Sequence, residues 1–195
     1  AEVINSVAML SIILTGAALI REREHGTIEH LLVMPVTPGE IMASKVTAMG
    51  LVVLIATAAS LKFVVQGLLG VPIEGSIALF LCGAVLCLFA MTSMGIYLAT
   101  LSRSMPQFGL LLMLTLLPMN LLSGGRTPRE SMPEIVQHLM QLAPTTHFVS
   151  LGQAILFRGA GIETVWQPFL ALLVIGTVLF VLSLRRFRNT ISQMA

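Results

Sequence analysis

Aspartate is absent from this chain of 195 residues, and charged residues make up only 10% of it. No apolar run gathers several acidic or histidine side chains, so a membrane-embedded enzyme is a distant possibility. The chain also lacks a G-x-x-x-x-G-K-[ST] motif, the loop that holds nucleotide phosphates in many ATPases. We therefore predict no catalytic residue, no metal site, and no cofactor in this chain.

Cysteine is scarce as well. Cys82 and Cys87 stand five residues apart in one apolar run, and a helix would point them in different directions. We favour the interpretation that both cysteines are small residues that serve in packing. The formal net charge of +2 is too low to indicate a nucleic-acid partner.

Apolar residues are what the sequence has in excess. They make up 56% of the chain, and the mean hydropathy is +0.94. This composition predicts an all-α integral membrane protein, a polytopic helix bundle in contact with membrane lipids. Five apolar runs approach the roughly 20 residues that a transmembrane helix needs. They cover about residues 3–20, 46–66, 77–101, 108–123 and 168–184.

The most polar stretch, residues 21–45, joins the first two runs. Ile28, Leu31 and Leu32 alternate with charges at helical spacing, which predicts a short amphipathic helix. Thr37 and Glu40 form a capping-box pattern that predicts a new helix start. We interpret the stretch as a docking surface; a solvated connecting loop is the alternative.

A second polar segment, residues 124–167, contains two short apolar patterns separated by Pro144. Neither is long enough to cross a bilayer, so we predict two short re-entrant or interfacial helices at the outer interface. Ile135, Val136, Leu139 and Met140 would share one stripe of the first helix.

The positive-inside rule orients the chain. With residues 21–45 and the C-terminus in the cytoplasm, seven Lys and Arg residues lie inside and three outside. Five spans would then place residue 1 outside, and the chain does not begin with Met. We expect a fragment of a longer protein with a further span upstream.

These features together resemble a known family. The pattern E-R-E-x-G-T-x-E-x-L-L-x-x-P occupies residues 22–35, between a first span and two spans joined by a short turn. A fourth span, the two short helices and a last span with a basic tail follow. This order resembles the permease subunit of type-two ATP-binding-cassette (ABC) exporters, in particular a bacterial inner-membrane branch of multidrug and efflux permeases. Residues 1–195 would form one permease domain that lacks the family's first span and any periplasmic insertion.

The resemblance implies a mechanism. In that family the loop after the second span carries a coupling helix that sits in a cleft of the ATP-binding subunit. ATP and Mg²⁺ would then bind to that subunit or domain, and a second permease copy or a paralogue would complete a dimer. The residues implied in docking are Glu22, Glu24, Gly26, Thr27, Ile28, Glu29, Leu31, Leu32 and Pro35.

Some residues outside the docking loop are candidates for the transport path. Lys62 would either snorkel to the headgroups or line a polar path. Pro118 and Asn120 would form a kink, either static or part of a gate. Ile135, Val136, Leu139, Met140 and Pro144 are candidates for an outer gate.

Two classes of function remain open at this point. The favoured one is a membrane-spanning export subunit powered by a separate ATPase. The alternative is a membrane scaffold without a transport path, which recruits a soluble partner through residues 21–45.

The predicted topology can be tested by cysteine labelling of intact cells. His30→Cys and Glu130→Cys are introduced separately into a background without Cys82 and Cys87. An impermeant thiol reagent should label position 130 and leave position 30 unlabelled, because only the former faces outward. Labelling of position 30 would contradict the assigned orientation.

Overall fold

The computed structural model describes residues 2–25, 37–68, 75–123 and 132–192. In these ranges the chain forms seven α-helices and one π-helical segment. α1 (Glu2–Glu24), α3 (Pro38–Ala59), α4 (Ile77–Leu101), α5 (Met105–Leu122) and α8 (Ile162–Ser192) are the long helices. α6 (Glu134–Met140) and α7 (Pro144–Arg158) are short, and η1 (Ser60–Leu68) prolongs α3 as a π-helix.

The predicted all-α membrane architecture is confirmed. Gly39–Phe63, Ile77–Leu101, Met105–Leu122 and Ile162–Asn189 are each long and apolar enough to cross a membrane. These four correspond to the last four predicted spans. The first predicted span lies within α1, a helix of 23 residues, several of whose side chains are outside the described residues.

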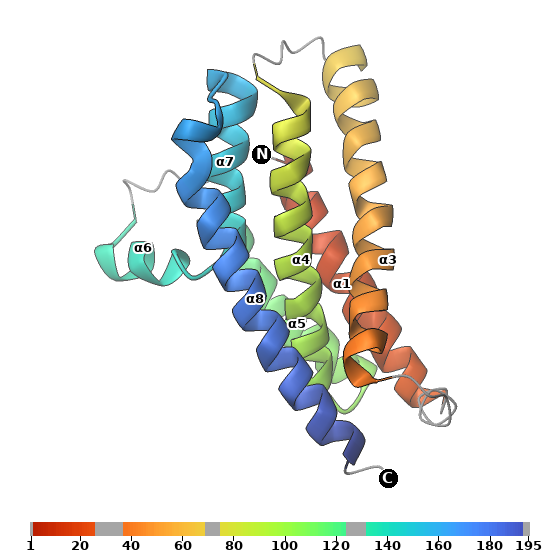
Figure 1. Ribbon diagram of the computed structural model, residues 1–195. Coiled ribbons are helices and arrows are strands. Elements are labelled where there is room, and N and C mark those ends of the chain that lie inside the picture. Colours follow the sequence, from red (N-terminus) through yellow and green to blue (C-terminus); the bar gives the residue numbers. More distant parts are fainter. Residues whose placement is uncertain (1, 26–36, 69–74, 124–131, 193–195) are drawn as a thin grey trace.

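α4 is the central helix of the bundle. It packs against α8, α1, α3 and α7, and in Figure 1 it runs between α3 and α8 along most of their length. Many of its side chains are fully buried, among them Phe80, Ala84 and Met91. Because hydrocarbon does not drive apolar surfaces together, these contacts depend on close packing and on bonds between helices.

Glycine allows α1 and α4 to approach closely. A Cβ atom at Gly95 would lie 2.7 Å from the carbonyl oxygen of Ile12, which is a backbone atom and cannot turn away. On the other side of α4, a Cβ atom at Gly176 of α8 would lie 2.7 Å from the Phe89 ring. The small residues therefore set the spacing of α1 and α8 around α4.

Several polar side chains within the spans have hydrogen-bond partners inside the bundle. Ser183 of α8 donates a hydrogen bond to the backbone oxygen of Ser93 in α4, at 2.7 Å and fully buried. Thr57 and Thr92 donate to carbonyl groups four residues earlier in their own helices. Such bonds satisfy hydroxyl groups where no bulk water is present.

The two predicted short helices are present as α6 and α7. α6 projects sideways at mid-height of the bundle, and α7 climbs from there to the end at which α8 begins (Figure 1). α6 ends at Met140, before Pro144, which is instead the first residue of α7. The proline ring suits that position because the first helical N–H needs no partner within the helix.

The close approach of α1 and α4 leads to a stability prediction. Gly95→Ala should lower the free energy of unfolding by about 1–3 kcal/mol, because the added methyl group meets backbone. Gly50→Ala is the matched control, since a Cβ atom there would have no neighbour within 4 Å. Unfolding of the purified protein in mixed micelles measures both changes, and equal stability of the two variants would contradict the packing argument.

Candidate functional site

An ion pair joins the two helices that flank residues 26–36. Glu22 in the last turns of α1 binds the ammonium group of Lys45 in the second turn of α3. Both side chains are partly buried, with relative exposures of 28% and 15%. Removing one partner would therefore leave a partly desolvated charge behind. The pair holds the start of α3 against the end of α1.

A second contact ties the end of α1 to a helix that begins 81 residues later. The Glu24 carboxylate accepts a hydrogen bond from the backbone N–H of Met105, the first residue of α5, at 3.0 Å. Ser104, the residue that precedes α5, makes no side-chain capping bond. Glu24 thus supplies both an acceptor and a negative charge at the positive end of α5.

The start of α3 is held by its own capping box, as the sequence predicts. Thr37 Oγ1 accepts from the Glu40 backbone N–H at 3.3 Å, and the Glu40 carboxylate accepts from the Thr37 N–H at 2.7 Å. Pro38 occupies the first helical position. The segment 26–36 is therefore flanked by two helix ends with fixed positions, and one of them also holds α5.

Most residues of the predicted docking set lie outside the described residues. This holds for Gly26, Thr27, Ile28, Glu29, Leu31, Leu32 and Pro35. Of the set, Glu22 and Glu24 are described, and both bond to other helices of the same chain. Their role in docking stays a prediction; their role in joining α1, α3 and α5 is an observation.

A cavity of about 410 Å³ lies where α5, α6 and α7 meet. This is within the size range of sites for small molecules. It brings together Pro118, predicted for the transport path, and Leu139, Met140 and Pro144, predicted for the gate. The other lining residues are Met94, Leu114, Thr115, Met119, Leu142, Ala143 and Leu179. Three methionines give this mostly apolar wall flexible side chains.

The remaining candidates of the path and gate lie elsewhere. Lys62 is exposed in η1, and Asn120 is half-buried near the end of α5. On α6, Ile135 is 75% exposed and Val136 is half-buried. None of these four residues lines the cavity. The positions of these four residues therefore do not test whether they belong to a gate or to the transport path.

Sequence reasoning missed several residues of this region. Lys45 and Met105 are the partners of Glu22 and Glu24, and nothing in the local sequence marks those pairings. Met94 and Leu179 line the cavity, and nothing in the local sequence marks them either. Thr145 and Thr146, in the first turn of α7, are each 1% exposed, and their hydroxyls have no hydrogen-bond partner among the described residues.

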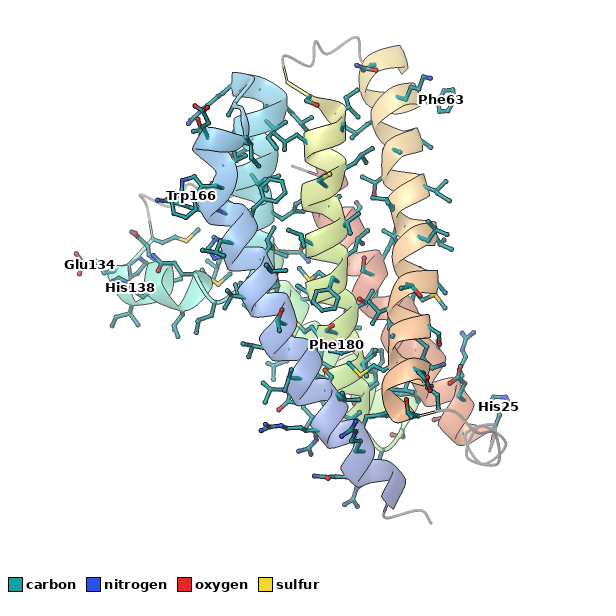
Figure 2. All side chains as sticks on the ribbon, viewed as in Figure 1. His25, Phe63, Glu134, His138, Trp166 and Phe180 are labelled. Carbon is teal, nitrogen blue, oxygen red and sulfur yellow. The ribbon has the colours of Figure 1, made fainter. Side chains whose placement is uncertain are left out.

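Histidines do not gather into a metal site in the described part of the chain. Within it, no group of three or more His, Cys, Asp or Glu side chains is arranged to hold a metal ion. His25 Nδ1 lies 2.8 Å from the Arg21 carbonyl oxygen, and His147 Nε2 lies 2.7 Å from that of Gln141. Both rings bond to backbone at helix ends. Figure 2 shows His25 at the end of α1, far from His138 on the projecting α6.

Comparison with known proteins identifies membrane transport proteins as relatives of this chain. Residues 2–157 match the family model described as ABC-2 type transporter. The chain is 63% identical over 193 residues to the inner membrane transport permease YhhJ of Escherichia coli (strain K12). The aligned residues make up 99% of this chain and 52% of that relative. It is 30% identical over 165 residues to the probable multidrug ABC transporter permease YbhR of the same organism, covering 84% and 44% of the two chains.

A eukaryotic relative is more distant. ABC transporter G family member 20 of Dictyostelium discoideum is 26% identical over 165 residues, which are 84% of this chain and 22% of that protein. The chain spans about half the length of the bacterial relatives that it matches.

The Glu24 cap predicts a measurable effect on stability. Glu24→Ala should lower the free energy of unfolding by about 1 kcal/mol, because the first N–H of α5 loses its acceptor. Glu24→Gln keeps an acceptor oxygen at the same position and should lose less than half as much. Thermal or chemical unfolding in detergent distinguishes the two. An equal loss from both variants would assign the effect to the negative charge, and no loss in Glu24→Ala would show that the cap contributes little.

Proposed function

This chain belongs to the ABC-2 type transporter family, and we propose that it is the membrane-spanning part of an exporter driven by ATP hydrolysis elsewhere. The ATPase would be a separate subunit or domain, which binds ATP and Mg²⁺. The observation that carries the proposal is the pair of contacts at the flanks of residues 26–36. Glu22 joins α1 to α3 and Glu24 joins α1 to α5.

These contacts support a coupling role for the segment. A force applied to residues 26–36 acts on the end of α1 and the start of α3 directly. It also reaches α5 through the Glu24 carboxylate, so the three helices would shift together. Coupling of this kind requires elements with discrete arrangements that both sites can bias, and rigid helices tied at one end would transmit such a bias together.

The surface of α5 supports assembly with a second copy or a paralogue. Its exposed large apolar residues are Leu110, Met113, Leu114, Leu117 and Leu121, each at least 50% exposed. They recur at a spacing of three or four residues and thus form one stripe along the helix. In a single copy of the chain, lipid would cover this stripe. In a homodimer or heterodimer, the stripe would instead lie beside the transport path.

The cavity at the junction of α5, α6 and α7 is our candidate for part of that path. α5 contains Pro118 within the helix, and α7 begins beside it with Pro144. Helices interrupted at membrane depth are a common way to build a transport site. A shift of α5 would change the shape of this cavity, which links the proposed coupling segment to the proposed gate.

Location and orientation complete the proposal. The apolar helices and the inner membrane relative support a multi-pass inner membrane protein. We place residues 21–45 and the C-terminus in the cytoplasm, where an ATPase would have access to the loop. The positive charges on this side support that orientation.

The docking role is tested with variants of the loop. Leu31→Ser with Leu32→Ser, and separately Glu29→Lys, should weaken co-purification of the ATPase by at least tenfold, because an apolar ridge and a flanking carboxylate are lost. Membrane insertion should not change, since no span is altered.

Matched controls come from the opposite end of the bundle. Phe157→Ser with Ile162→Ser removes two exposed apolar side chains, and Glu163→Lys reverses one exposed carboxylate. These controls should bind the ATPase normally. Normal binding by the loop variants, or equal losses in the controls, would argue against a coupling role.

A further inference from the structure

The cytoplasmic end of α8 carries exposed arginines that no part of the proposed transport mechanism uses. α8 has 31 residues, which corresponds to about 46 Å of helix and exceeds the roughly 30 Å of a hydrocarbon core. The predicted last span ended at residue 184, but the helix continues through Arg185, Arg186, Phe187 and Arg188. The end of α8 therefore extends beyond the apolar part of the membrane.

Packing sets the rotation of this helix end. Ser183 is bonded to α4, and Phe187, one turn later, is only 5% exposed. Leu184 lies next to Gly39, because a Cβ atom there would be 3.9 Å from Leu184 Cδ1. One side of the α8 end is thus held by the bundle, and Arg185 and Arg188 lie on the exposed side.

The same exposed side faces lipid tails farther along α8. Val174, Val178, Val181 and Leu182 are 40–54% exposed and form a stripe along the helix. Arg185 follows Val178 by seven residues and Val181 by four, so it continues this stripe. Arg188 follows Arg185 by three residues, which places both guanidinium groups on neighbouring turns of one face.

The depth of Arg185 can be estimated from the other end of α8. Trp166 is 53% exposed near the start of the helix, where Figure 2 shows it at the outer surface of the bundle. Tryptophan side chains gather at membrane interfaces. Arg185 lies nineteen residues farther on, about 28 Å along the helix axis, which is close to the thickness of the hydrocarbon core. Arg185 therefore lies at the level of the opposite layer of headgroups.

From this geometry we infer that Arg185 and Arg188 form a binding site for the phosphate group of an anionic phospholipid. Guanidinium groups bind phosphate oxygens through paired hydrogen bonds, and two of them on adjacent turns can hold one headgroup. Neither side chain has an ion-pair partner among the described residues. The acyl chains of the same lipid would lie against the valine and leucine stripe, so the site fits both parts of the molecule.

The site is tested on the purified protein in neutral detergent. The protein is titrated with phosphatidylglycerol or, separately, with phosphatidylcholine. Native mass spectrometry measures how many lipid molecules each protein molecule retains. We expect the protein to retain phosphatidylglycerol preferentially. Each arginine near a charged membrane surface contributes about fivefold in affinity, so Arg185→Gln with Arg188→Gln should lower retention of phosphatidylglycerol roughly 25-fold.

A matched control removes two positive charges from the other end of the bundle. Lys62→Gln with Arg158→Gln alters exposed residues far from the α8 end and should leave retention unchanged. Thermal unfolding in the same detergent verifies that all variants remain folded. Equal retention of the two lipids by the unaltered protein, an unchanged double arginine variant, or an equal loss in the control would each overturn the inference.

Two further experiments distinguish the lipid from free phosphate and from a protein partner. Inorganic phosphate at millimolar concentration should not displace the lipid; displacement would indicate a site for free phosphate instead. The double arginine variant should also still co-purify with the ATPase. A loss of the ATPase with unchanged lipid retention would assign this surface to a protein partner and overturn the lipid site.

Discussion

The absence of hydrogen-bond partners in hydrocarbon is the constraint on which this structure depends. Each backbone N–H and C=O group within a bilayer must be satisfied by the chain itself, which favours long helices and makes every helix end costly. The buried hydroxyls of Thr57, Thr92 and Ser183 bond to carbonyl groups within the bundle for the same reason. Helix ends are therefore placed where water, a side chain or a close neighbour can satisfy them.

The Glu24 contact lies at an exposed end of the bundle, where it caps one helix and connects distant parts of the chain. α5 starts without a capping side chain of its own, and the end of α1 provides one. Together with the Glu22–Lys45 pair, this contact joins α1, α3 and α5 beside residues 26–36. In the proposed mechanism, this contact would also provide a route from the docking segment to the cavity beside Pro118.

Local signals in the sequence predicted local structure well. The bounds of α4 match the apolar run at 77–101, and Thr37 and Glu40 form the predicted capping box, because both features depend on neighbouring residues. From hydropathy alone, the last span was predicted to end at residue 184. α8 continues beyond that residue because arginine is a good helix former outside the hydrocarbon.

Contacts between distant segments could not be predicted in the same way. Glu22 and Lys45 are 23 residues apart, and Glu24 and Met105 are 81 apart. The sideways course of α6 at mid-height of the bundle is likewise not marked by its amphipathic pattern. The docking residues between Gly26 and Pro35 remain a prediction from sequence and family resemblance.

The central claim is that α1 and α5 move as one unit when the partner ATPase binds nucleotide. Spin labels at Arg21→Cys and Gly109→Cys, both exposed positions, report the distance between these helices in the assembled transporter. Pulsed electron paramagnetic resonance compares the nucleotide-free and ATP-bound states. The account predicts that the distance stays constant with Glu24 present and changes between the two states in Glu24→Ala. A distance that changes between the states with Glu24 present would contradict it.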